Sequence, residues 1–255
     1  MADLFALSGK HALITGGSSG LGRFFAETLS ARGARVTVAA RRAKALAKTV
    51  EHISGKRGLA HSVVMDVTAP QSIEGAFEAA EAQFGPVEIV INNAGVTSTR
   101  AALEQDEASW DKVIDTNLKG VWLVAQSAGR RMIAHGVKGS IVNIASILGL
   151  RVAGGVAPYA ISKAGVVQMT KALALEWARH GIRVNALAPG YFETELNDDF
   201  FRGDAGQALI KRIPQRRLGE LRELEGPLLL LASNASSYMT GSIVIVDGGH
   251  LVSSL

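Results

Sequence analysis

A tyrosine and a lysine one helical turn apart are the residues whose types and spacing first suggest chemistry. Tyr159 and Lys163 lie four residues apart in a segment that begins at Pro158, and this spacing places both on one face of a helix. A phenol has a reference pKa of about 10, so it serves as a base near neutral pH only where a cation favours the phenolate. Lys163 can supply that cation, and Ser146, 13 residues before Tyr159, can return beside the helix through a loop. The three residues predict a proton-transfer site, although a tyrosine and a lysine at this spacing also occur together by chance.

The elements that must position these residues are predicted by short apolar runs that alternate with longer amphipathic segments. Most of the runs are apolar on both faces, which is typical of parallel strands covered by helices. The pattern therefore predicts a doubly wound α/β fold, with a seven-stranded parallel sheet and helices on both faces. The predicted strands are residues 11–15, 34–40, 61–66, 87–92, 140–145, 182–188 and 242–247.

No linker interrupts this alternation, so we expect residues 1–255 to form a single domain. The one stretch without clear periodicity spans about residues 190–219. A long irregular insertion after a late strand is often a mobile lid over a ligand site. We therefore expect this stretch to cover a substrate.

A glycine-rich turn follows the first predicted strand. Such a turn, placed between a strand and a helix, binds anions because backbone N–H groups and the helix dipole point at the ligand and glycines permit close approach. The spacing differs from the GxGxxG fingerprint and from a P-loop, and the glycines could also simply form a tight turn. The candidate phosphate-binding residues are Gly16, Ser18, Ser19, Gly20, Leu21 and Gly22.

Two arginines at the end of the second predicted strand indicate which dinucleotide this turn would hold. A ribose 2′-hydroxyl calls for an acidic residue at this position, whereas a 2′-phosphate calls for arginine. Arg41 and Arg42 stand there, so NADP(H) is favoured and NAD(H) is the second candidate. Arg41 is the first choice for the phosphate, although both arginines could instead be the solvated start of a helix. Asp66, after the third strand, could accept a hydrogen bond from an adenine amino group or cap the next turn.

Composition excludes several other classes of protein. The 27 Lys and Arg residues exceed the 23 Asp and Glu residues by only four and are scattered, so we expect no nucleic-acid binding. The chain has no cysteine, and its six histidines lack metal-ligand spacing, so we expect neither disulfides nor a metal. The apolar run at residues 4–7 is too short for a signal peptide, and no run is long enough to span a membrane. We expect a cytoplasmic protein that does not bind membranes.

Taken together, the motifs show that the sequence resembles the short-chain dehydrogenase/reductase family over essentially its whole length. The motifs that carry the resemblance are TGGSSGLG (15–22), NNAG (92–95), Asn117, Ser146, YAISK (159–163), Pro189 with Gly190, and SSYMTGSIVIVDGG (236–249). The resemblance implies a Rossmann-type fold, a nicotinamide dinucleotide as hydride carrier, and a homotetramer. It also implies a catalytic tetrad of Asn117, Ser146, Tyr159 and Lys163.

The resemblance further implies a role for each of these residues. Ser146 would hydrogen-bond the substrate carbonyl and Tyr159 would donate a proton to its oxygen. Lys163 would hold the nicotinamide ribose, and Asn117 would hold a water that connects the lysine to solvent. The residues implied to contact the rest of the dinucleotide are Asp66 and Val67 near the adenine, Asn92, Asn93, Ala94 and Gly95 as a floor, and Pro189, Gly190, Phe192 and Thr194 beside the nicotinamide.

The substrate is less well determined by the sequence. Ile147, Leu148, Leu150 and Val152 follow Ser146, and Val96, Tyr191, Phe200 and Phe201 are further candidates for the pocket wall. These apolar residues favour a small ketone or secondary alcohol with a hydrophobic body, but they could equally be ordinary core. A 3-oxoacyl thioester reductase and a sugar alcohol dehydrogenase remain open.

Two other classes of function are weighed against this one. Residues 16–20 also fit the GxSxG elbow of a serine hydrolase, with Ser18 as nucleophile and Asp247 and His250 in the correct chain order. An elbow after the first strand and the lack of an HGGG segment make this a remote alternative. A dinucleotide-binding protein without catalytic activity is the other alternative.

Overall fold

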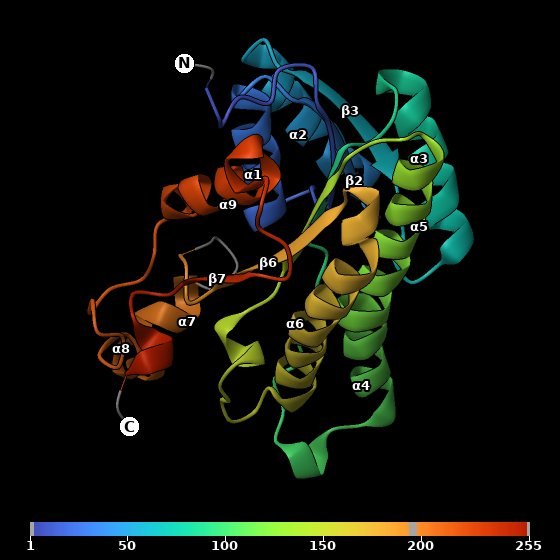
Figure 1. The fold of residues 1–255 in the computed structure, drawn as a ribbon. Coiled ribbons are helices and arrows are strands. Elements are labelled where there is room, and N and C mark those ends of the chain that lie inside the picture. Colours follow the sequence, from blue (N-terminus) through green and yellow to red (C-terminus); the bar gives the residue numbers. More distant parts are fainter. Residues whose placement is uncertain (1–2, 194–197, 254–255) are drawn as a thin grey trace.

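The computed structural model describes residues 3–193 and 198–253, and its centre is one twisted sheet of seven strands (Figure 1). All strands are parallel, in the order β3-β2-β1-β4-β5-β6-β7. The chain builds the sheet outward from β1 to β3 and then crosses back to place β4 on the other side of β1. The strands are β1 (His11–Thr15), β2 (Arg35–Ala40), β3 (Leu59–Val64), β4 (Ile89–Asn92), β5 (Ser140–Ile144), β6 (Arg183–Pro189) and β7 (Ile243–Val246).

The predicted doubly wound fold is confirmed; β1 has the expected boundaries, and the other strands differ from them by one or two residues. The largest shift is at β3, which ends at Val64, two residues earlier than the sequence pattern suggested. Met65 still bonds β2 through its backbone, but the Asp66 carboxylate accepts the Thr68 N–H at 2.9 Å and turns the chain towards the next helix. In β1, β4 and β5 every residue is buried, as expected for strands covered on both faces.

Helices cover the sheet in two layers (Figure 1). On one face Phe25, Leu29 and Leu228 belong to a core built from α1, α2 and α9, and on the other Phe77 and Leu173 belong to a core built from α3, α5 and α6. Full burial of side chains of this size stabilises a fold by about 2 kcal/mol each. The helices are α1 (Gly20–Ala31), α2 (Ala43–Gly55), α3 (Pro70–Phe84), α4 (Glu107–Ile114), α5 (Gly120–Ala134), α6 (Ala157–Trp177), α7 (Asp198–Arg202), α8 (Asp204–Ile210) and α9 (Glu225–Ala232).

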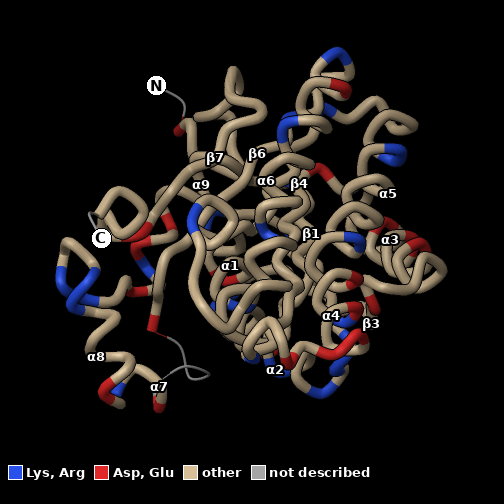
Figure 2. The backbone as a smooth tube through the Cα atoms, turned by 90° about the horizontal axis from the view of Figure 1, so that it is seen from below, with Lys and Arg blue, Asp and Glu red and all other residues tan. Residues whose placement is uncertain are grey.

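Charged side chains join the two helices at the outer edge of the second layer. Acidic residues line α3 in Figure 2, and Arg131 of α5 lies over the Phe77 ring while pairing with Glu74 at 2.8 Å and Glu81 at 2.7 Å. These contacts fix α5 along α3, and α5 in turn packs beside α6, the helix that carries Tyr159 and Lys163. Among the helices of residues 3–193 and 198–253, none has the length and hydropathy of a membrane span.

The stretch predicted as an irregular lid has more structure than its sequence suggested. It contains the short helices α7 and α8, and its two ends are tied together: Gly219 N–H donates to the Tyr191 carbonyl at 2.9 Å, and Glu193 N–H donates to the Gly219 carbonyl at 3.2 Å. The end of this stretch also packs on the turn after β7, because Gln215 N–H donates to the Gly248 carbonyl. The segment therefore closes on itself, as a compact surface loop does.

Candidate active site

The predicted site residues gather around a pocket of about 550 Å³ at the carboxyl edge of the sheet. The pocket extends from the turn after β1 to the first turns of α6, at the place where the chain reverses its direction across the sheet. Ligands of doubly wound sheets usually bind at this position. The predicted residues that line it are Gly16, Ser18, Ser19, Gly20, Leu21, Arg41, Arg42, Asp66, Val67, Asn93, Ala94, Gly95, Ser146, Tyr159, Lys163, Pro189, Gly190 and Phe192.

The glycine-rich turn leaves bare backbone facing this pocket. Gly16 has a φ of +67°, and a Cβ there would lie 2.8 Å from the Asn93 amide nitrogen. Gly22 does not line the pocket; a Cβ on it would overlap the Gly16 carbonyl, so this glycine allows α1 to start against the turn. At Gly20, by contrast, the space is open. A backbone without side chains at the start of a 12-residue helix fits the phosphates of a dinucleotide.

Arg42 lies closer to this turn than Arg41 does. The Arg42 guanidinium donates to Ser18 Oγ at 3.1 Å and to Ser19 Oγ at 3.0 Å. The pKa of Asp66 is lowered mainly by hydrogen bonds from Thr68 and to a smaller extent by the charge of Arg41. The Asp66 carboxylate also accepts the Thr68 hydroxyl at 2.8 Å, so it acts as a cap for this turn. Both arginines line the pocket, and Arg42, the second choice from the sequence, is the one bonded to the serines of the glycine-rich turn.

Ser146, Tyr159 and Lys163 meet at the other end of the pocket. Ser146 Oγ accepts the Leu148 N–H at 3.1 Å, and it lies close enough to the Tyr159 phenol to lower the pKa of that group. Lys163 is 4% exposed; its Nζ donates to the Ile144 carbonyl at 2.7 Å and lies 5.6 Å from the centroid of the Tyr159 ring. The first turn of α6 and the end of β5 therefore bring the three side chains together, as the sequence predicted.

The electrostatics of this cluster differ from the sequence-based expectation. Burial raises the pKa of Tyr159, the hydrogen bond from Ser146 lowers it, and Tyr191 raises it further. Burial also lowers the pKa of Lys163 from 10.5 to about 8. We expected Lys163 to lower the pKa of the phenol, but burial has the largest influence on that pKa and raises it. An ionised phenol at this site needs a further positive charge close by.

Asn117 lies behind the pocket rather than on its surface. It is fully buried in a π-helical turn, Asp115–Lys119, that interrupts the run from α4 to α5. Its amide donates to the Val96 carbonyl at 2.8 Å and to Ser162 Oγ at 3.2 Å, and its Oδ1 accepts the Val96 N–H at 2.8 Å. Asn117 therefore fixes the floor of the pocket, and its predicted role in holding a water stays a prediction.

Several lining residues were not among those predicted. Ala39, Ala40, Met65, Thr97, Thr116, Ile144 and Ala145 also face the pocket. Most of them stand at or just after the ends of strands, so the rule that ligands bind at carboxyl ends could have identified them. Thr116 had no such signal, because it reaches the pocket through the π-helical turn. Thr194, also predicted, lies outside the described residues.

The predicted apolar wall is only partly formed. Val96 and Tyr191 line the pocket, whereas Ile147 is buried in the core and Val152 is 84% exposed. Phe201 is buried and packs edge-on against Tyr191, with 6.0 Å between ring centroids.

The residues proposed for a serine hydrolase do not assemble. Ser18 Oγ is bonded by Arg42, the Asp247 carboxylate accepts the backbone N–H groups of Gly249 and Leu251, and the His250 ring packs against Tyr191. This arrangement lacks the hydrogen bonds from an acid to a histidine and from the histidine to a serine that a nucleophilic serine requires.

Comparisons with known proteins agree with this geometry. The model of the family described as enoyl-(acyl carrier protein) reductase matches residues 16–250. Gluconate 5-dehydrogenase from Gluconobacter oxydans is 40% identical over 253 residues, 98% of each chain, and galactitol 2-dehydrogenase (L-tagatose-forming) from Cereibacter sphaeroides is 39% identical over 252 residues, again 98% of each. The crystal structure of a gluconate 5-dehydrogenase from Burkholderia cenocepacia in complex with NADP and tartrate superposes with a TM-score of 0.94, at 37% identity and with 99% of each chain covered. On this evidence of sequence, fold and site, the chain belongs to the short-chain dehydrogenase/reductase family of NAD(P)-dependent oxidoreductases.

Proposed function

We propose that this protein transfers a hydride between NADP(H) and the carbonyl or secondary alcohol of a small substrate, with Tyr159 as the general acid and base. One observation carries the proposal: Ser146, Tyr159 and Lys163 meet in the same pocket that the glycine-rich turn and Arg42 enter from the other end. The nicotinamide, when bound, supplies the hydride in reduction and accepts it in oxidation. The remaining steps belong to side chains of this chain.

Each of these side chains has a distinct task. Ser146 holds the substrate oxygen next to Tyr159, and the phenol gives its proton to that oxygen in reduction or takes one in oxidation. Lys163 holds the nicotinamide ribose and places a positive charge near the phenol. Asn117 keeps the Val96 backbone in position under the substrate.

Arg42 is the residue that we expect to distinguish NADP(H) from NAD(H). Replacing Arg42 by Ala should raise the Kd for NADPH about 30-fold and change the Kd for NADH less than about threefold, because a charge-assisted hydrogen bond contributes about 2 kcal/mol. Titration of each cofactor by fluorescence would measure both constants.

Arg41→Ala is the matched control, since it removes the same charge one residue away. A larger loss of NADPH affinity in Arg41→Ala would restore the sequence-based choice, and equal losses for both cofactors would contradict recognition of a 2′-phosphate.

The relatives bear on the class of substrate. Their names include a gluconate dehydrogenase and a galactitol dehydrogenase, which supports the sugar alcohol alternative over a substrate with a hydrophobic body. The family description names an acyl carrier protein substrate, so a thioester stays a second candidate.

The test is absorbance of the reduced nicotinamide during incubation with NADP⁺ and a panel of polyols, sugar acids and 3-hydroxyacyl thioesters. Turnover of one class supports the proposal; absence of turnover across the panel, in both directions, contradicts it.

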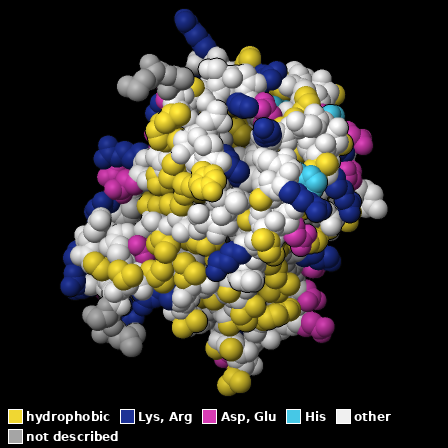
Figure 3. All heavy atoms as spheres, in the orientation of Figure 1, with side chains coloured by type: hydrophobic (Ala, Val, Ile, Leu, Met, Phe, Trp, Pro, Cys, Tyr) yellow, Lys and Arg dark blue, Asp and Glu magenta, His cyan; other side chains and the backbone are white. Residues whose placement is uncertain are grey.

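A homotetramer in the cytoplasm completes the proposal. Exposed apolar side chains gather over α6 in Figure 3, and Trp122, Ile161 and Leu175 on α5 and α6 are 40%, 49% and 84% exposed. Such a face is commonly buried between subunits. Light scattering should give four times the chain mass of 26.8 kDa, and Ile161→Glu should lower that mass, whereas a monomeric wild type would contradict the proposal.

A chain without cysteine does not require an oxidising compartment, which supports the cytoplasm.

A further inference from the structure

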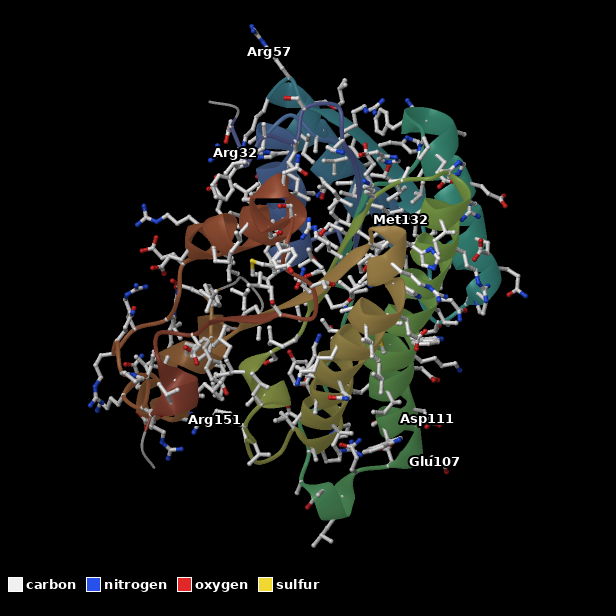
Figure 4. All side chains as sticks on the ribbon, in the orientation of Figure 1. Arg32, Arg57, Glu107, Asp111, Met132 and Arg151 are labelled. Carbon is white, nitrogen blue, oxygen red and sulfur yellow. The ribbon has the colours of Figure 1, made fainter. Side chains whose placement is uncertain are left out.

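A second pocket, of about 580 Å³, lies at the amino edge of the sheet, opposite the edge that holds the active site. Its wall includes the residues at which β4, β5 and β6 begin and the residue just before β1. In Figure 4 Met132, which lies against Gly139 of this pocket, stands well away from Arg151 on the loop after β5. A volume of this size is typical of sites for small molecules. Because the two pockets open at opposite edges of the sheet, a ligand in this amino-edge pocket would contact neither the dinucleotide nor Tyr159.

The amino-edge pocket carries more positive than negative charge. Three cations and one acid line it: Lys10, Lys138, Arg183 and Glu88. Lys10 pairs with Glu88, and both side chains are partly buried. In the described part of the chain, the Lys138 ammonium forms no hydrogen bond or ion pair, and Arg183 pairs with no carboxylate. The pocket therefore holds two positive charges, from Lys138 and Arg183, that the protein does not neutralise.

The fold holds both of these cations at the pocket wall. The Arg183 guanidinium donates to the carbonyls of Leu231 at 3.1 Å and Ser233 at 3.0 Å, at the end of α9. These neutral acceptors fix its position and leave its charge in place. The stem of Lys138 lies against Gly181, which has a φ of +74° and whose Cβ, if present, would lie 2.9 Å from Lys138 Cγ. The glycine therefore allows the lysine stem to pack on the backbone while the ammonium stays free for a ligand.

Neutral hydrogen-bonding groups stand in the same pocket. Gly139 is buried and its carbonyl accepts the Arg183 N–H at 3.0 Å, but its own N–H has no acceptor among the described residues. Buried backbone N–H groups almost always have a partner, so an acceptor from outside the chain is expected here. Asn234 and Ser237 also line the pocket, and neither side chain has a hydrogen-bond partner within residues 3–193 and 198–253. These groups suit the oxygens of an anion.

We propose that the amino-edge pocket binds a small metabolite with a phosphate monoester group, which Lys138 contacts directly and Arg183 attracts. A phosphate monoester carries a charge of about −1.5 to −2 at pH 7, so it matches the two uncompensated cations, whereas a single carboxylate would leave one of them unmatched. Lysine is a common phosphate ligand, and the polar groups beside it can bind the remaining oxygens. The volume leaves room for a body of the size of a sugar. This site is separate from the proposed oxidoreductase chemistry, so it can be tested independently of that function.

D-glucitol 6-phosphate and D-glucitol provide a matched pair of probes, because they differ only in the phosphate. Calorimetric titration of the full chain saturated with NADPH, in a buffer without phosphate, measures the Kd of each. NADPH occupies the glycine-rich turn and Arg42, and a reduced nicotinamide cannot accept a hydride from an alcohol, so neither the cofactor site nor turnover contributes to the heat. We expect one molecule of D-glucitol 6-phosphate per chain with a Kd below about 1 mM, and a Kd for D-glucitol at least about tenfold higher.

Two substitutions in the pocket should change this affinity in opposite directions. Lys138→Met keeps the length of the side chain and removes its charge, so the Kd for D-glucitol 6-phosphate should rise about tenfold. Glu88→Gln removes the only acid among the described residues that line the pocket and frees Lys10, so the Kd should fall about threefold. Lys48→Met is the charge control, because it removes an exposed lysine of α2 that does not line the pocket, and it should keep the wild-type Kd.

No binding of D-glucitol 6-phosphate, or binding no tighter than that of D-glucitol, would overturn the inference. A wild-type Kd in Lys138→Met, or a higher Kd in Glu88→Gln than in the wild type, would overturn it as well, because the phosphate would then bind elsewhere. Binding seen only without NADPH would place the phosphate at the glycine-rich turn instead. Circular dichroism checks that each variant is folded. A chain that binds D-glucitol 6-phosphate as expected but turns over no alcohol or carbonyl would contradict only the oxidoreductase function.

Discussion

Tyr159→Phe is expected to lower turnover about 1,000-fold while the Kd for NADPH changes less than about threefold. The substitution keeps the ring on α6 at the pocket and removes only the hydroxyl beside Ser146. General acid–base catalysis by a positioned side chain contributes about 10²- to 10⁴-fold, and without the hydroxyl the substrate oxygen has no group to exchange its proton with. Steady-state rates of NADPH oxidation and a separate binding titration would measure the two quantities.

The other two tyrosines of the chain serve as controls for this substitution. Tyr238 is fully exposed on the surface, so Tyr238→Phe should have wild-type kinetics. Tyr191 lines the same pocket as Tyr159, so Tyr191→Phe tests whether the loss is specific to one phenol; we expect a loss below about tenfold. An inactive Tyr191→Phe enzyme beside an active Tyr159→Phe enzyme would contradict the proposal, because the acid would then be Tyr191.

The cluster of Ser146, Tyr159 and Lys163 could be predicted from the sequence because its geometry is mostly local. Tyr159 and Lys163 share one helical face at their spacing, and Pro158 marks the start of that helix. Ser146 lies two residues after the end of β5, and the carboxyl ends of parallel strands meet at one edge of the sheet. These placements follow from helix periodicity and strand direction, and neither depends on contacts between distant segments.

The features that the sequence did not predict depend on such contacts. The contact of Arg42 with Ser18 and Ser19 depends on how the chain turns into α2, which brings its guanidinium to a segment more than 20 residues earlier. The raised pKa of Tyr159 reflects its burial and the nearby Tyr191, which belongs to the segment that follows β6. In the stretch from 190 to 219, the residues just after α8 pack against the turn after β7, and the stretch itself shows no clear periodicity. Burial and long-range packing are properties of the assembled fold, so a pattern along the chain cannot supply them.

Lys163→Met is the second substitution with a large expected effect, and it tests whether the ammonium acts on the phenol. Methionine has a similar length and no charge, so it removes the cation that lies 5.6 Å from the Tyr159 ring. We expect kcat/KM for alcohol oxidation to fall about 100-fold. The acidic limb of its pH profile, on which activity rises as the phenol ionises, should move to higher pH, because the phenolate is then less stable and forms at a higher pH. A profile with the wild-type limb would contradict an electrostatic role for Lys163 and leave only its contact with the ribose.

The same substitution has a consequence for stability that does not depend on catalysis. Because burial lowers the pKa of Lys163 from 10.5 to about 8, the folded protein binds this proton more weakly than the unfolded chain does. The wild type should therefore gain stability as the pH rises from about 8 to 10.5, by at most about 3 kcal/mol from this group. Lys163→Met lacks this gain. The unfolding free energy of the wild type should therefore increase relative to that of Lys163→Met across that range. Denaturant unfolding at pH 7 and pH 10 measures the shift, and parallel stability curves for the two proteins would show that Lys163 is not held as a buried cation.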